Sequence, residues 1–162
     1  MADDTHDHQV CVENALEQAE AVCRDRGLRL TPLRRVVLEL VWQGHEPVGA
    51  YDLLDALTKQ GHSPSPPTVY RALDFLIQAG LVHRLDSLNA YVGCNAPAHK
   101  HESAFLICRS CRNVHELGVD KIRGQIESLA DEVGFAAEEH VLEVQGVCAK
   151  CQQGNLQPAA SN

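Results

Sequence analysis

The sequence contains no long hydrophobic run: no stretch approaches the roughly 18 apolar residues of a membrane-spanning helix. The first ten residues are polar and acidic, so no signal peptide is expected. These absences predict a soluble, cytoplasmic protein without a membrane partner. In that compartment, seven cysteines favour metal or redox chemistry over structural disulfides, and nine histidines shift the balance towards metal.

A positive charge excess is also missing, since the formal net charge is −8 at pH 7. Such a chain gains little long-range attraction to DNA, which argues against a protein that binds DNA by charge alone. The charge is unevenly distributed, however. Residues 24–35 hold five arginines against one aspartate, and residues 21–86 hold eight Lys/Arg against seven Asp/Glu. A basic face in this region still allows DNA binding through specific contacts.

The first half of the chain predicts a winged helix-turn-helix domain over residues 14–94, after a disordered tail over residues 1–13. Helical patterns run from Asn14 to Arg26, from Pro32 onward, from Gly49 to Gln60, and from Pro66 to a C-terminal Gly80. The last of these helices has apolar residues at i, i+3, i+4 and i+7, namely Val69, Ala72, Leu73 and Leu76. Two short strand-like runs around an Asp-Ser-Leu-Asn turn then form the wing.

Three single residues in this domain have expected packing roles. Ser65 suits the N-cap of the last helix. Cys23, which has no CxxC partner, is expected to be a small buried hydrophobe. Trp42 is expected to pack in the core or at a hinge.

Candidate DNA contacts lie mainly on the last helix, because that helix enters the major groove in winged helix-turn-helix folds. Thr68 and Arg71 are predicted on its exposed face, with Tyr70 at the flank. Arg34, near the start of the second helix, fits a phosphate contact and a solvated helix face equally well. Arg84 in the hairpin is a further candidate.

The second half predicts an αβ domain over residues 103–151, after a hinge over residues 95–102 and before a disordered tail over residues 152–162. Strands are expected over residues 103–107, 113–117 and 140–147, with a helix over residues 119–132. That helix is expected to turn four apolar residues inward: Ile122, Ile126, Leu129 and Val133. The fold class is therefore α+β.

Two CxxC pairs, separated by 36 residues, are the strongest chemical signal. They are Cys108 with Cys111, and Cys148 with Cys151. Together they supply the four sulfurs of a closed tetrahedral zinc site, which is structural because it has no open position for substrate. A short three-stranded domain with few aromatic residues needs the stabilisation that such a metal site provides. The alternative is two redox pairs, but a redox CxxC usually opens a helix in a βαβ pattern, and neither pair is predicted to do so.

A second group has mixed nitrogen, sulfur and oxygen ligands, which suit zinc. It consists of His83, Cys94, His101 and Glu116, spread over the wing, the hinge and the strands that follow. An ion held by all four would link the two domains and bias their hinge. Taken singly, however, His83 fits a phosphate contact and Glu116 a solvated strand residue. Further candidate ligands are His99, His115 and His140.

Four segments resemble the ferric uptake regulator family, and most closely its zinc uptake branch: PPTVYRALDFL, GLVHRLDSLNAYVGC, FLICRSC and GVCAKC. The resemblance implies a homodimer, with an N-terminal winged helix and a C-terminal αβ dimerisation domain in each subunit. It also implies metal-dependent binding to palindromic operators in double-stranded DNA. The segment HKHESAFLIC departs from the histidine-rich run typical of the iron branch. The family's third metal site is therefore in doubt, although His140 matches one of its ligands.

Position by position, the resemblance implies a structural zinc site at the four CxxC cysteines and a regulatory zinc site at His83, Cys94, His101 and Glu116. That makes two Zn²⁺ per subunit. It also implies DNA contacts at Tyr70 and Arg71. We therefore expect a zinc-responsive regulator that represses zinc-uptake genes, and neither an enzyme nor a binder of a small-molecule substrate.

Three alternatives remain at the level of the sequence. One is a regulator of the same family that senses iron, manganese or peroxide. Another is a thiol redox switch that uses Cys108 and Cys111. A zinc hydrolase or deaminase is disfavoured, because the chain has no HExxH and no His-x-Glu segment to accompany its cysteine pairs.

Overall fold

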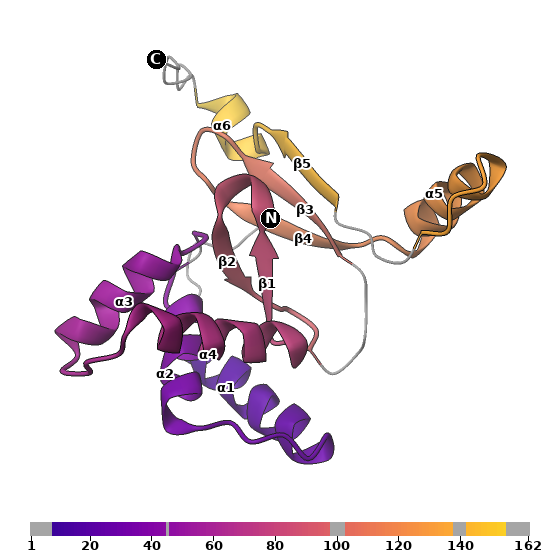
Figure 1. The fold of residues 1–162 in the computed structure, drawn as a ribbon. Coiled ribbons are helices and arrows are strands. Elements are labelled where there is room, and N and C mark those ends of the chain that lie inside the picture. The colour runs from indigo at the N-terminus through magenta and orange to yellow at the C-terminus, as the bar shows by residue number, and fades with distance from the viewer. Residues whose placement is uncertain (1–7, 45, 98–102, 138–141, 155–162) are drawn as a thin grey trace. The chain divides into compact units, whose positions relative to one another are not determined.

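The computed structural model describes residues 8–44, 46–97, 103–137 and 142–154. Internal contacts divide the chain into two compact units, Met1–Lys100 and His101–Asn162. The predicted hinge, residues 95–102, contains this boundary. Both units combine helices with a small sheet (Figure 1), which confirms the α+β class. Within the described residues, no helix combines the length and the apolar character required to span a bilayer.

The first unit consists of four helices and a hairpin (Figure 1). Its elements are α1 (His8–Asp25), α2 (Pro32–Trp42), α3 (Ala50–Lys59), α4 (Pro66–Gln78), β1 (Val82–Leu85), the 3-10 turn η1 (Asp86–Leu88) and β2 (Ala90–Gly93). Strands β1 and β2 pair antiparallel and form the predicted wing. Helix α1 begins six residues before the predicted start at Asn14, so residues 8–13, which were expected in the tail, are helical. Residues 1–7 lie outside the described part.

The core of the first unit is formed by the apolar faces of its helices, and in α4 this is the face that helical spacing predicts. All four predicted residues of α4 are buried: Val69, Ala72, Leu73 and Leu76. In α2 and α3 the buried residues are Val37, Leu38, Leu40, Val41, Leu53 and Leu57. Cys23 is 2% exposed, and burial raises its pKa above the ordinary thiol value, as expected of a small buried hydrophobe.

The two ends of α4 differ in how they are capped. Gly80 has a φ of 69° and donates its N–H to the Ile77 carbonyl at 2.8 Å, while Leu81 N–H reaches the Leu76 carbonyl at 2.9 Å. This pair of bonds is a Schellman ending, which favours glycine at the left-handed position. Ser65 is the N-cap residue as predicted, but its hydroxyl bonds to the Thr68 hydroxyl at 2.9 Å and not to a helix N–H.

The wing is anchored to the helices from both sides. Tyr91 in β2 exchanges two backbone hydrogen bonds with Val48, at 2.9 and 3.0 Å, which adds a short bridge before α3. Gly93 lies against the indole of Trp42, so closely that a Cβ there would lie 2.1 Å from a ring carbon. Trp42, the last residue of α2, therefore packs against the wing, and it also contacts the buried core of the first unit.

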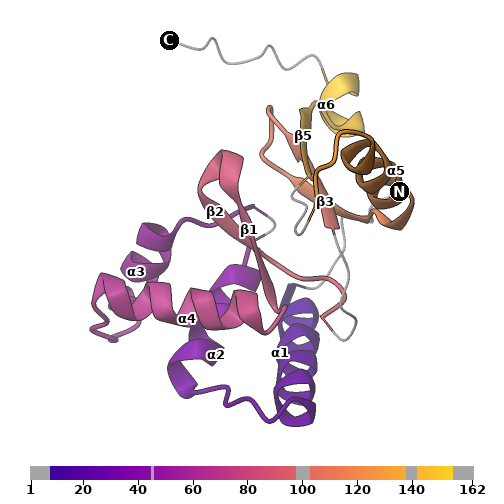
Figure 2. The same ribbon diagram turned by 45° about the vertical axis from the view of Figure 1, so that its right-hand side comes forward.

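The second unit is built on a three-stranded sheet in the order β4-β3-β5. Its elements are β3 (Ser103–Cys108), β4 (Val114–Gly118), α5 (Asp120–Glu132), β5 (Leu142–Gly146) and α6 (Ala149–Gln153). Strand β3 pairs antiparallel with β4 and parallel with β5, and α6 follows directly at the end of β5 (Figure 2). The predicted third strand began at residue 140, but residues 138–141 lie outside the described part.

Helix α5 differs from the expectation that its apolar residues point inward. Its exposed side chains are Ile122 (43%), Ile126 (37%), Leu129 (63%) and, just after it, Val133 (80%). Figure 1 shows the helix standing clear of the sheet. Helical spacing identifies residues that share a face, but it does not identify what covers that face. The inward prediction is therefore wrong for the described part of a single chain.

Candidate metal centre and nucleic-acid interface

Four cysteine sulfurs meet at one end of the second unit. The residues are Cys108 at the end of β3, Cys111 in the turn after it, Cys148 at the N-cap of α6, and Cys151 within α6. All four Sγ atoms lie within 4.8 Å of one another. The structure thus brings together the two CxxC pairs that the sequence singled out.

Backbone hydrogen bonds shape the pocket of sulfurs. Arg112 adopts a left-handed φ of 57° and donates its N–H to the Cys108 carbonyl at 2.8 Å, which closes the first turn. Arg109 N–H reaches the Gly146 carbonyl at 2.9 Å and so attaches this turn to the end of β5. The Cys148 N–H donates to Cys108 Sγ at 3.3 Å. The two pairs are therefore held together by backbone bonds as well as by the sheet.

The sulfur spacing fits a zinc ion. Cys111 Sγ and Cys148 Sγ are 3.7 Å apart. A tetrahedron with zinc–sulfur bonds of about 2.3 Å has edges of about 3.8 Å, whereas a disulfide needs about 2.05 Å. All seven cysteines are free of disulfides. The donor set and its spacing therefore match a closed four-sulfur zinc site.

The electrostatics of the cluster depend on hydrogen bonds between its members. The Cys148 N–H, with help from the Cys111 N–H, lowers the pKa of Cys108 to about 6. Hydrogen bonds with the Cys148 and Cys111 thiols raise the pKa of Cys151 to about 12. A thiolate on Cys108 is thus favoured before Cys151 loses its proton. Metal binding displaces those protons, so acid weakens it.

One expectation about the second CxxC pair was wrong. Cys148 is the N-cap of α6, and its carbonyl accepts the Gln152 N–H at 2.9 Å, so this pair does open a helix. The helix has only five residues. Its position alone would fit a redox pair. The convergence of both pairs on one point instead favours a shared metal site.

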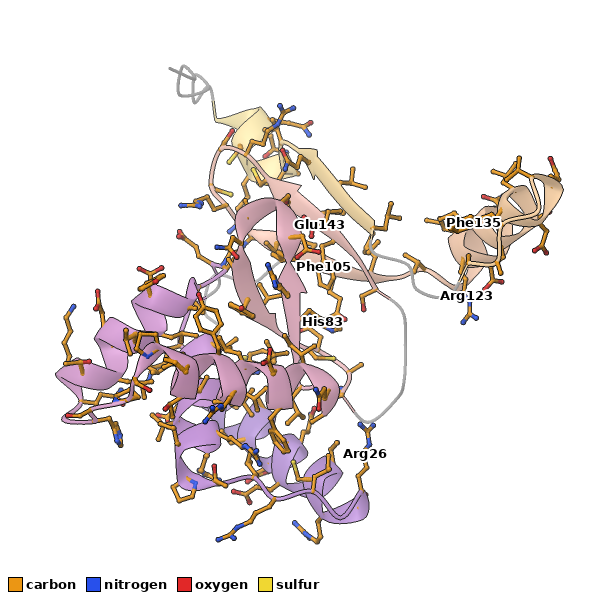
Figure 3. The ribbon with its side chains drawn as sticks, viewed as in Figure 1. Arg26, His83, Phe105, Arg123, Phe135 and Glu143 are labelled. Atoms are coloured by element: carbon orange, nitrogen blue, oxygen red, sulfur yellow. The ribbon has the colours of Figure 1, made fainter. Side chains whose placement is uncertain are left out.

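Within the first unit, two predicted ligands of the regulatory site come together in the wing. His83 lies on β1 opposite Val92, and Cys94 immediately follows β2. The Cys94 N–H donates to the Leu81 carbonyl at 3.0 Å, and its side chain is 3% exposed. A ring nitrogen of His83 and Cys94 Sγ lie within 4.8 Å of each other. Figure 3 labels His83 on this hairpin. An imidazole nitrogen and a thiolate at this spacing are two suitable zinc ligands.

The second unit holds Glu116 on β4, and Ser103 fixes its carboxylate. Ser103 Oγ donates to Glu116 Oε1 at 2.5 Å. In the β3–β4 pair, Phe105 lies directly opposite Glu116, and Ser103 is the diagonal neighbour of Glu116 on the same face. Sequence reasoning missed Ser103, because only the strand register reveals this neighbour.

The remaining candidate histidines are less well placed. His115 is exposed, and it alternates with Glu116 along β4, so its side chain lies on the other face of the sheet. His99, His101 and His140 lie outside the described residues. The fourth predicted ligand of the regulatory site, His101, thus stays a prediction.

Helix α4 presents the predicted DNA-contacting face. Tyr70 is 40% exposed and Arg71 is exposed, whereas the residues on either side of this pair, Val69 and Ala72, are buried. Thr68 is half-buried, with its hydroxyl bonded to Ser65. An aromatic and a guanidinium group are therefore available on the outer side of a helix held rigidly by its apolar face.

Arg34 and Arg84, the other two predicted DNA contacts, have partners inside the unit. The guanidinium of Arg34 lies 3.6 Å from the centroid of the Phe75 ring and donates to the Arg29 carbonyl at 2.7 Å. Arg84 pairs with Asp86 at 3.1 Å. These contacts join α2 to α4 and stiffen the wing. A role of either arginine on DNA stays a prediction.

Comparison with known proteins gives consistent results. The family model of the ferric uptake regulator family matches residues 25–145. The zinc uptake regulation protein of Escherichia coli (strain K12) is 42% identical over 140 residues, covering 86% of this chain and 82% of the relative. The peroxide-responsive repressor of Staphylococcus aureus is 28% identical over 142 residues, covering 87% and 94%. A solved structure of a zinc uptake regulator complexed with zinc and DNA is 41% identical, with a TM-score of 0.83, covering 88% and 95%.

Proposed function

The chain belongs to the ferric uptake regulator family, and we propose that it is a zinc-responsive transcription regulator whose zinc-loaded homodimer represses zinc-uptake genes. The family consists of regulators, so the protein is a regulator and not an enzyme. Identity is 42% to a zinc uptake regulation protein and 28% to a peroxide-responsive repressor, which favours zinc as the signal. Cys94 adds a soft ligand, which suits zinc better than iron or manganese.

The observation that carries this proposal is the position of the His83 and Cys94 pair. Both residues lie in the wing of a winged helix, directly after α4 in the chain. Their candidate ligand atoms are within 4.8 Å of each other. The groups that would hold an ion and the helix that would read DNA therefore belong to one compact unit. A movement of these ligands when zinc binds could therefore be transmitted to α4 within the same unit.

We assign two Zn²⁺ to each subunit. The structural ion would be held by Cys108, Cys111, Cys148 and Cys151. The regulatory ion would be held by His83, Cys94, His101 and Glu116, as the resemblance to the zinc branch implies. Ser103 would keep the Glu116 carboxylate oriented for its role through the 2.5 Å hydrogen bond.

When bound, zinc would supply a strong, tetrahedral link between ligands that are far apart in the sequence. The contacts with DNA would be made by residues of α4. Arg71 can donate two parallel hydrogen bonds to guanine, or pair with a phosphate. Tyr70 can pack on a thymine methyl group or donate to a phosphate. Coupling of about 1–3 kcal/mol per site, as is common in allostery, changes operator affinity about 5–150-fold.

A homodimer gives the exposed apolar face of the second unit a partner. Three residues on one face of the sheet, Leu106, Leu117 and Val144, are each 39–46% exposed in the single chain, and Leu129 on α5 is 63% exposed. Exposed apolar surface of this extent is typical of an interface. Two winged helices related by a two-fold axis fit a palindromic operator of double-stranded DNA. Such a regulator works in the cytoplasm.

The experiment that tests the function is selection from random DNA duplexes at buffered high and vanishing free zinc. The wild type is compared with Cys94→Ser and with Cys11→Ser, a matched control in α1. We expect zinc to enrich a palindrome for the wild type and for Cys11→Ser. Cys94→Ser is expected to remain a folded dimer that no longer responds to zinc.

Each other outcome has a defined meaning. If Cys94→Ser responds as the wild type does, Cys94 is not a sensing ligand and the regulatory set is wrong. If iron or manganese enriches the palindrome and zinc does not, the metal is wrong but the family function stands. If no sequence is enriched with any metal, the regulator proposal fails.

A further inference from the structure

Arg26 occupies the point at which α1 ends. Its N–H donates to the Val22 carbonyl at 3.1 Å, and the chain then turns at Gly27, which has a φ of 63°. Gly27 N–H bonds to the Arg24 carbonyl at 3.2 Å and Leu28 N–H to the Cys23 carbonyl at 2.8 Å, a second Schellman ending. The backbone of Arg26 is therefore fixed by a helix that is packed into the core.

The side chain of Arg26 reaches two backbone carbonyls that are distant in sequence. Nη1 donates to the Ala79 carbonyl at 2.9 Å, and Nη2 donates to the Pro97 carbonyl at 3.3 Å. Ala79 is the C-cap of α4, and Pro97 is a buried residue three positions after Cys94. Figure 3 labels this arginine where it extends from the end of α1.

The Ala79 carbonyl needs such a partner. The Schellman ending of α4 uses the carbonyls of Ile77 and Leu76, and leaves the last carbonyl of the helix without a helix N–H. A cation at a helix C-terminus is also favoured by the helix dipole. One guanidinium therefore satisfies the end of α4 and at the same time holds the segment that leaves the wing.

We propose that Arg26 is a positioning residue, which couples the segment after Cys94 to the DNA-contacting helix α4 through its two hydrogen bonds. The inference rests on the proposed function, because it assumes that zinc at Cys94 changes the affinity of α4 for DNA. A rigid guanidinium fork can bind two carbonyls in fixed directions, whereas an ammonium group is a point charge on a flexible stem. The coupling thus depends on the fork and not on the charge.

The first test measures the tether with the regulatory site empty of zinc and without DNA. Amide hydrogen exchange is followed in the full-length chain for wild type, Arg26→Ala, Arg26→Lys and the control Arg24→Ala, which removes an exposed charge from the same turn. Exchange at residues 94–96 is expected to accelerate in both Arg26 variants and to stay unchanged in Arg24→Ala. Unchanged exchange in Arg26→Ala would show that the two hydrogen bonds hold nothing in solution.

The second test measures coupling with the same four proteins. Operator affinity is determined by fluorescence anisotropy at vanishing and saturating free zinc, on a duplex selected by the wild type. We expect the zinc-induced gain in affinity to shrink about fivefold, the size of a weak allosteric coupling, in both Arg26 variants. Zinc-free affinity should fall no further in Arg26→Ala than in Arg24→Ala, because both lose one positive charge.

The outcomes separate this inference from the function on which it rests. A full zinc response in Arg26→Ala, with faster exchange at residues 94–96, would refute the coupling role and leave the regulator intact. A full response in Arg26→Lys alone would show that charge suffices and would refute the fork. No zinc response in the wild type would instead overturn the proposed function, whatever the exchange data show.

Discussion

Replacing Gly93 with alanine tests how firmly Trp42 holds the wing. The new Cβ would lie 2.1, 2.3 and 2.6 Å from three atoms of the indole ring. Carbon atoms in contact are about 3.5–4.0 Å apart, so the ring or the strand must move by about 1.4 Å or more. The backbone itself allows alanine, since Gly93 does not have a positive φ. The cost therefore comes from overlap alone.

The expected size of the effect follows from that overlap. Overpacking of this kind costs about 1–3 kcal/mol, and each kcal/mol lowers Tm by roughly 4–8 °C in a domain of 60–100 residues. If the indole moves outward, its fluorescence shifts to longer wavelength. If β2 moves, Cys94 moves with it, and the affinity for regulatory zinc falls.

The chain suits this measurement, because Trp42 is its single tryptophan and lies in the first unit. Urea unfolding followed by tryptophan emission therefore reads the first unit only. Gly44→Ala, in the same unit, is the matched control, since the nearest atom a Cβ there would meet is the Glu46 nitrogen at 3.8 Å, an ordinary contact, and Gly44 does not have a positive φ. A Gly93→Ala protein with the wild-type midpoint and emission spectrum would refute the close packing of Trp42 on the wing.

Three further predictions concern the other features of the molecule. Cys151→Ser is expected to lose one zinc ion per subunit and the order of the second unit. The reason is that binding of a structural zinc contributes about 10–16 kcal/mol, whereas the whole free energy of unfolding of a typical domain is about 5–15 kcal/mol. Zinc content is measured by atomic emission spectrometry, and retention of the ion would contradict this prediction. Leu129→Glu should leave the single chain folded, because the side chain is 63% exposed, but should weaken the dimer in sedimentation experiments; an unchanged dimer would exclude α5 from the interface. Burial raises the pKa of Cys23 above its ordinary 9.0, so above about pH 9 the native state retains a proton that the unfolded chain releases. The free energy of unfolding should therefore fall as the pH rises through about 9. Urea titrations of Cys23→Ala should show a smaller fall with pH, and an equal fall would show that Cys23 is not its cause.

The elements of the first unit could be predicted because their signals are local. The apolar face of α4 follows from a spacing that one helix turn repeats, and Gly80 marks its end because few other residues adopt a positive φ. The four-sulfur cluster was also predictable, since zinc chemistry requires four ligands and two CxxC pairs supply them.

The features that sequence reasoning missed depend on distant neighbours. Arg26 reaches carbonyls 53 and 71 residues further along the chain, which no local pattern encodes. Ser103 meets Glu116 only through the register of β3 and β4. For α5, periodicity identified the apolar face correctly, but the partner of that face is not in the described part of the same chain.

The arrangement of the four sulfurs also sets an order of events during protein synthesis. Cys151 lies 51 residues beyond Lys100, the last residue of the first unit. At about 5–20 residues per second, ribosomes need about 3–10 s to make that stretch. The winged helix can thus fold before the four cysteines of the second unit have all been made. Strand β5 of that unit is also made late. If the proposed structural zinc orders the second unit, we expect a newly made chain to dimerise only after its second cysteine pair has emerged and bound zinc. Zinc supply would then limit the number of mature regulators as well as their occupancy.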